Sequence, residues 1–75
     1  MKLVKIIWED AIGADGWISR KELEKETPII HTTVGYVVID KPEYITITMS
    51  YDEKEINLGA WMVIPRKYIK KIIKL

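Results

Sequence analysis

The chain has 75 residues, no cysteine and a single histidine, His31. This length leaves room for one domain spanning residues 1–75, and the composition excludes disulfides and a zinc site built from cysteine and histidine. Twelve basic and eleven acidic residues give a net charge of +1, small for a protein that binds nucleic acid through its phosphates. Nucleic acid is therefore not expected as a partner.

The sequence shows no membrane segment, because no apolar run approaches the roughly 18 to 20 residues that span a bilayer. Lys2 and Lys5 interrupt the apolar start of the chain, which is not typical of an export signal. We therefore expect a cytoplasmic protein that does not contact membranes.

The first third of the chain predicts one strand followed by a long connection. Residues 2–8 are apolar and β-branched, and their alternation places Val4, Ile6 and Trp8 on one face. After a loop rich in glycine and aspartate, Ser19 and Glu22 have the spacing of a capping box. This pattern predicts a helix of about two turns that ends before Pro28. Long connections in compact domains are often functional.

The remaining residues predict four more strands joined by short turns. The expected strands are residues 30–39, 44–50, 56–64 and 69–75, with a single turn at 66–68 after Pro65. Gly35 interrupts the first of these and indicates a bulge, a bend or a close approach of another backbone. Alternation predicts that Ile45, Ile47 and Met49 face the core, opposite an outer row of hydroxyls at Thr46, Thr48 and Ser50. In residues 56–64 it places Ile56, Leu58, Ala60, Met62 and Ile64 on one face.

Five short strands and one long first loop favour a small antiparallel barrel of the SH3-like kind. Closing the sheet into a barrel removes the exposed edges of a short sheet. We therefore expect a mostly β, five-stranded SH3-like barrel with one short helix in the long first loop.

Residues 63–69, Val-Ile-Pro-Arg-Lys-Tyr-Ile, resemble the end of SH3 domains, where an aliphatic-Pro-x-x-Tyr-aliphatic stretch forms one helical turn before the last strand. The resemblance covers about a tenth of the chain and implies the same topology. The tyrosine-rich N-terminal motif and the adjacent tryptophan pair of SH3 domains are absent, so it does not imply recognition of proline-rich peptides.

Most of the chain is similar to small, mostly uncharacterised phage-encoded proteins of this length. The similar segments are residues 8–11 (WEDA), 15–17 (DGW), 33–36 (TVGY), 49–53 (MSYDE) and 61–66 (WMVIPR). Small phage accessory proteins often inhibit host defences, either by trapping nucleotide signals or by capping a host protein. The resemblance implies these two functions without deciding between them.

The sequence contains no evident catalytic residues, and we expect no enzyme activity, cofactor or metal. His31 is the only imidazole, and a lone histidine in a strand is more often a surface or packed residue than a base. The acidic pairs Glu9-Asp10 and Asp52-Glu53 lie in adjacent positions, where side chains usually point apart. They are typical of solvated loop charges.

Aromatic and basic residues are better candidates for binding. Trp8 is expected in the core, whereas Trp17 and Trp61 are either packed or exposed as aromatic platforms. An exposed platform can stack a nucleobase, and Arg66 with the C-terminal lysines could pair with a phosphate. The lysines could equally form a solubilising tail, and the hydroxyls could be the wet face of a strand. The candidate ligand-binding residues are Trp17, Thr46, Thr48, Tyr51, Trp61 and Arg66.

The leading hypothesis is a phage-type protein that oligomerises with copies of itself and sequesters a small nucleotide-like ligand as an anti-defence sponge. The alternative is a protein-interaction module that binds and inhibits a host protein through the long first loop or an exposed strand. The expected partners are therefore a nucleotide-like ligand or a host protein, together with further copies of the chain.

Overall fold

The computed structural model describes every residue from 1 to 75 and contains five strands and two short helical segments. In chain order these are β1 Leu3–Asp10, α1 Arg20–Leu23, β2 Ile29–Asp40, β3 Tyr44–Tyr51, β4 Leu58–Pro65, the 3-10 helix η1 Arg66–Tyr68 and β5 Ile69–Lys74. Every paired strand is antiparallel. The expected mostly β fold, with one short helix in the long first loop, is confirmed.

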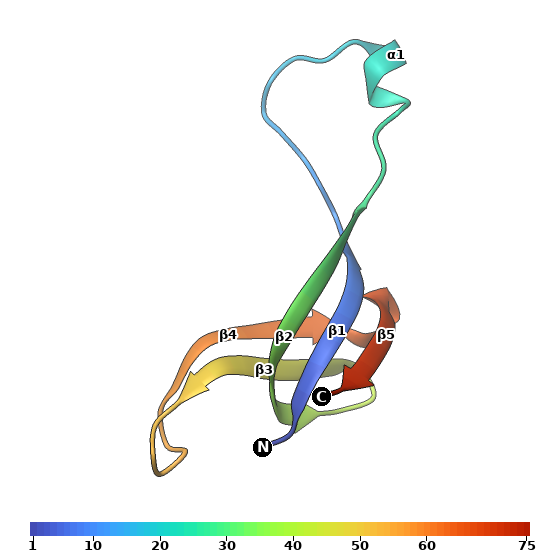
Figure 1. Ribbon diagram of the computed structural model, residues 1–75. Coiled ribbons are helices and arrows are strands. Elements are labelled where there is room, and N and C mark those ends of the chain that lie inside the picture. The colour runs from blue at the N-terminus through green and yellow to red at the C-terminus, as the bar shows by residue number, and fades with distance from the viewer.

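The strands form a single sheet in the order β4-β3-β2-β1-β5 (Figure 1). Sequential strands from β1 to β4 are neighbours, and β5 returns to pair with β1. The segment η1 occupies the predicted single turn between β4 and β5. Because β4 and β5 are the two edges and do not pair, the sheet is open, and the closure of the expected barrel is not seen.

Five aliphatic side chains form the buried core of the sheet. They come from three strands: Val4, Ile6, Ile45, Ile47 and Ile64. Trp8, Val37, Ile69 and Ile72 pack against them and are partly buried. The predicted inward face of the first strand is therefore correct. Burial of each aliphatic side chain stabilises the fold by about 1.5–3 kcal/mol, so this cluster is the main source of stability.

Two predicted inward faces are only partly buried. Met49 is 62% exposed and Ile56 is 71% exposed, although strand alternation placed both toward the core. In β4 only Ile64 is buried, because β4 is an edge strand and most of its length has no second layer over it. Ala60 also has a positive φ of 55°, which interrupts the regular geometry of the strand.

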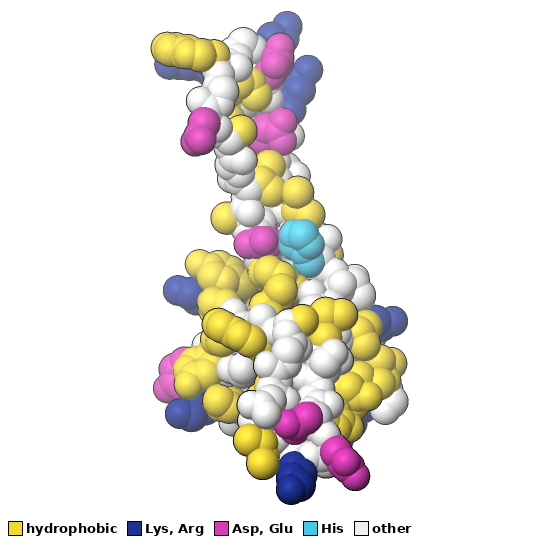
Figure 2. All heavy atoms as spheres, turned by 90° about the vertical axis from the view of Figure 1, so that its left-hand side faces the viewer, with side chains coloured by type: hydrophobic (Ala, Val, Ile, Leu, Met, Phe, Trp, Pro, Cys, Tyr) yellow, Lys and Arg dark blue, Asp and Glu magenta, His cyan; other side chains and the backbone are white.

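The long first loop projects from the sheet as an arm, defined here as residues 9–30 (Figure 1). Figure 2 shows it as a lobe joined to the sheet by a narrow neck, and the molecule measures 52 Å along its longest axis. Every residue from 11 to 32 is exposed. The chain therefore has two parts: the arm, and the sheet body formed by all other residues.

The helix in the arm is shorter than predicted. The side chain of Ser19 accepts a hydrogen bond from the backbone N–H of Glu22 at 3.2 Å, so the predicted N-cap is confirmed. The helix nevertheless ends at Leu23, after one turn rather than two. Isolated short helices are marginal in water, and no buried face holds this one.

Gly35 allows β2 to lie close against β3. A Cβ atom at this position would lie 3.1 Å from Cδ1 of Ile47 and 3.1 Å from the carbonyl oxygen of Thr48. The close backbone approach, one of the meanings expected for this glycine, is therefore confirmed. The φ angle of Gly35 is not positive, so the requirement for glycine is steric rather than conformational.

We predict that Gly35→Ala destabilises the protein by about 1–3 kcal/mol, because the added methyl group overpacks the core and one of its contacts is a backbone oxygen. Urea denaturation gives the change in unfolding free energy. Gly13→Ala is the matched control, since a Cβ there meets nothing within 4 Å and stability should change by about 0.5 kcal/mol or less. Equal midpoints for the two variants would contradict the prediction.

Candidate binding surfaces

Two aromatic residues flank Thr48 on one face of the sheet, and the ring of a third contacts one of them. Thr48 on β3 pairs with Tyr36 on β2 and with Trp61 on β4. Residues directly opposite each other on neighbouring strands point to the same face, so the two aromatic side chains flank Thr48. The ring of Tyr51 meets that of Tyr36 edge to face at 4.9 Å and 85°. We call Tyr36, Thr46, Thr48, Tyr51 and Trp61 the aromatic face.

Thr48 lies at the centre of the aromatic face and is completely buried. Its hydroxyl lies within hydrogen-bonding distance of two carbonyl oxygens, 2.9 Å from that of Ser50 and 2.8 Å from that of Gly59. The predicted outer row of hydroxyls is therefore wrong at Thr48, because its side chain is buried and its hydroxyl is hydrogen-bonded to backbone oxygens. This hydroxyl joins β3 to β4 and is not presented to solvent.

Trp61 offers the most accessible aromatic surface on the sheet. Its side chain is 67% exposed, whereas Tyr51 is 40% exposed. Thr46 is half-buried on the same side of β3, opposite Val63. Four of the predicted ligand-binding residues, Thr46, Thr48, Tyr51 and Trp61, thus lie in one region. Tyr36 was not among the predicted residues, because its position opposite Thr48 depends on the strand register.

Arg66 is engaged in contacts within the chain. Its guanidinium pairs with the carboxylate of Asp40, and its Nε donates a hydrogen bond to the carbonyl oxygen of Lys41 at 3.0 Å. Its backbone N–H donates to the carbonyl oxygen of Glu43. These contacts fix η1 to the turn between β2 and β3. A phosphate would have to displace Asp40 to reach this guanidinium.

The C-terminal lysines lie on the other edge of the sheet from Trp61. Lys70, Lys71 and Lys74 are exposed on β5, whereas Trp61 is on β4. Charged side chains on an edge strand discourage pairing with other chains. The lysines therefore discourage other chains from pairing with the free edge of β5.

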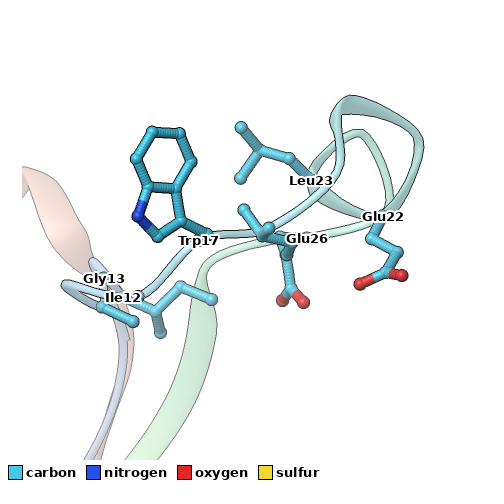
Figure 3. A pocket seen from close by; sticks show the side chains of 9 residues that line it. Ile12, Gly13, Trp17, Glu22, Leu23 and Glu26 are labelled. Carbon is cyan, nitrogen blue, oxygen red and sulfur yellow. The ribbon is translucent and has the colours of Figure 1, made fainter.

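Trp17 precedes α1 by three residues at the tip of the arm, and α1 lies far from β3 and β4 (Figure 1). The side chain of Trp17 is fully exposed and lines an open hollow of about 490 Å³. Leu23 points toward the indole, while the carboxylate of Glu26 points away from it (Figure 3). Trp17 and the other predicted ligand-binding residues therefore belong to two separate surfaces.

His31 lies at the base of the arm, against Trp8. The two rings stack at a centroid distance of 5.1 Å, and Nε2 of His31 lies 3.5 Å from the carboxylate of Asp10. The indole N–H of Trp8 donates a hydrogen bond to the hydroxyl of Thr33 at 2.9 Å. Trp8 is thus partly buried and packs against the core, as predicted. Its ring also stacks on His31, the residue opposite it on β2 just outside the arm.

No protein-family model, curated protein or solved structure matches this chain. Neither helical segment of the structure has the length and apolar character needed to cross a membrane.

The turn between β3 and β4 is organised by Asp52 and follows directly after Tyr51. The carboxylate of Asp52 accepts hydrogen bonds from the backbone N–H of Ile56 at 2.8 Å and from the side-chain amide of Asn57 at 2.9 Å. The Ile56 bond, with smaller contributions from Asn57, lowers the pKa of Asp52 below its ordinary value of 3.8. The ionised carboxylate is therefore the form that stabilises the turn.

We predict that the turn loosens in acid as Asp52 is protonated. A lowered pKa means that its stabilisation is complete above about pH 4 and is lost as the pH falls through the folded-state pKa. The amide chemical shift of Ile56, followed by NMR, should titrate with a midpoint below 3.8. Asp52→Asn should abolish this titration and Glu53→Gln should not. A midpoint at or above 3.8 would contradict the assignment.

Proposed function

We propose that this chain is a non-enzymatic, phage-type binding protein that sequesters a small nucleotide-like ligand on the aromatic face. The observation that carries the proposal is the 67% exposure of Trp61 on the face that also holds Tyr36. An indole held on a strand is a flat, ordered surface on which a nucleobase can stack. In an infected cell such a protein would act in the cytoplasm as an anti-defence sponge.

Stacking, rather than phosphate pairing, supplies most of the affinity in this proposal. Stacking on an aromatic side chain contributes about 1–3 kcal/mol per base. Arg66 is already paired with Asp40, so a phosphate gains little from it unless that pair breaks. The base should therefore be the part of the ligand that the protein recognises.

We also propose that the sheet belongs to the SH3-like barrel class. The strand order β4-β3-β2-β1-β5 and the single turn of η1 before the last strand support this assignment. They are the features that the resemblance of residues 63–69 to SH3 domains implies.

A second candidate function, inhibition of a host protein, is supported by a different observation. Trp17 is fully exposed at the tip of the arm, and tryptophan is enriched among the residues that dominate protein interfaces. Capture of one stoichiometric host protein from lysate, lost in Trp17→Ala and retained in Trp61→Ala, would favour this function.

We predict that isothermal calorimetry detects binding of one or more linear or cyclic nucleotides, and none of ribose phosphate or inorganic phosphate. Trp61→Ala should weaken that binding by roughly 5- to 150-fold, which corresponds to the stacking energy of one base. Trp17→Ala is the control, because this residue lies in the arm and does not contribute to the aromatic face.

Absence of heat with every nucleobase-containing compound would refute the sequestration proposal. Equal affinities of the wild type and Trp61→Ala would show that a bound nucleotide lies elsewhere. Binding of inorganic phosphate with similar affinity would also contradict it, since that ligand has no base to stack.

A further inference from the structure

The arm exposes apolar side chains that a free surface rarely carries together. Trp17 is fully exposed, Leu23 is 57% exposed, and Ile12, Ile18, Ile29 and Ile30 are 43–50% exposed. The only backbone hydrogen bonds of the loop beyond the strands run within residues 19–26. Extended hairpins are marginally stable alone, and exposed apolar clusters mark interaction sites. The arm therefore has the properties of a segment that docks on another surface.

The charges of the arm and of the sheet body are opposite. The arm carries six acidic and three basic residues, a net charge of −3, whereas the sheet body carries five acidic and nine basic residues, a net charge of +4. Two of the acidic residues, Glu22 and Glu26, line the same hollow as Trp17 (Figure 3). The tip of the arm, by which we mean residues 12–26, thus exposes apolar side chains next to acidic ones. A surface that complements the tip would be apolar with basic neighbours.

The sheet body has such a site. An open hollow of about 460 Å³ is lined by the apolar side chains of Val4, Val37, Ile45 and Ile72, together with Lys2 and Lys74. Asp40 also lines it, but the charge of this residue is offset by its pairing with Arg66. Val4 and Ile45 are buried and form the floor of the hollow, whereas Val37 and Ile72 keep part of their surface exposed. We call this site the basic hollow.

The basic hollow and the tip lie at opposite ends of the molecule. The N-terminus, which contributes Met1 and Lys2 to the hollow, lies at the end of the sheet body away from α1 (Figure 1). Two copies placed side by side in opposite directions therefore bring each tip to the basic hollow of the other. This arrangement has two-fold symmetry and closes without forming a filament.

We propose that the arm docks on a second copy of this chain, with Trp17 of each copy seated in the basic hollow of the other. Glu22 and Glu26 of one copy then lie near Lys2 and Lys74 of the second. One aromatic side chain buries about 150–250 Å², well below the roughly 1,200–2,000 Å² of a stable interface. Two reciprocal contacts, with the flanking aliphatic residues, are therefore required. This inference does not depend on the nucleotide proposal.

Size-exclusion chromatography with light scattering tests the inference on the full chain. The wild type should have twice the chain mass of 8.8 kDa, and Trp17→Ala should be a monomer. Trp61→Ala removes the other exposed tryptophan and should remain a dimer. A monomeric wild type, a filament, or a dimeric Trp17→Ala would each overturn the proposal.

A charge exchange tests the predicted pairing of the tip with the basic hollow. Glu22→Lys with Glu26→Lys makes the tip basic, and Lys2→Glu with Lys74→Glu makes the hollow more acidic. Each double variant alone should be monomeric, because like charges then meet at both contacts. An equimolar mixture of the two should restore the dimer, because opposite charges then meet at both contacts.

Circular dichroism melting establishes that the double variants are folded, since all four substitutions lie on exposed positions. Failure of the mixture to dimerise, with both variants folded, would overturn the proposed pairing. Capture of a host protein by a wild type that stays monomeric would assign the arm to the second candidate function instead.

Discussion

β2 can lie close against β3 because it has no side chain at Gly35. At this position Ile47 and the backbone of Thr48 lie close enough that a methyl group would meet both at 3.1 Å. Gly35 pairs with Val4 on the other side, so the glycine lies between strands whose aliphatic side chains form one cluster. With only seven buried residues, the protein depends on this approach more than a larger domain would.

Much of the fold could be predicted from the sequence, because its elements are locally encoded. The strands and the turn at 66–68 follow from alternation and from proline and glycine positions, and they match the structure within two residues at each end. The burial of β4 could not be predicted, because alternation identifies a face without showing whether another layer covers it. The length of α1 was overestimated because the capping signal starts a helix, while tertiary packing determines how far it extends.

The candidate binding residues were predictable by type and less so by location. The sequence left open whether Trp17 and Trp61 are packed or exposed, and the structure exposes both. Their separation onto two surfaces depends on how far the arm projects, which local sequence does not encode. The pairing of Arg66 with Asp40 and the position of Tyr36 are contacts between residues distant in sequence, and they follow only from the register.

The complete exposure of residues 11–32 separates the parts of the chain that are free to change from those that are not. No side chain in this stretch belongs to the hydrophobic cluster, so its composition can drift without a penalty in folding. Specificity can then evolve in the loop while the strands keep their sequence, much as variable loops diversify on a constant framework. Under such selection, related chains would share the glycine in β2 and the aliphatic pattern, and between Ala11 and Pro28 they would share only the residues that dock, such as Trp17.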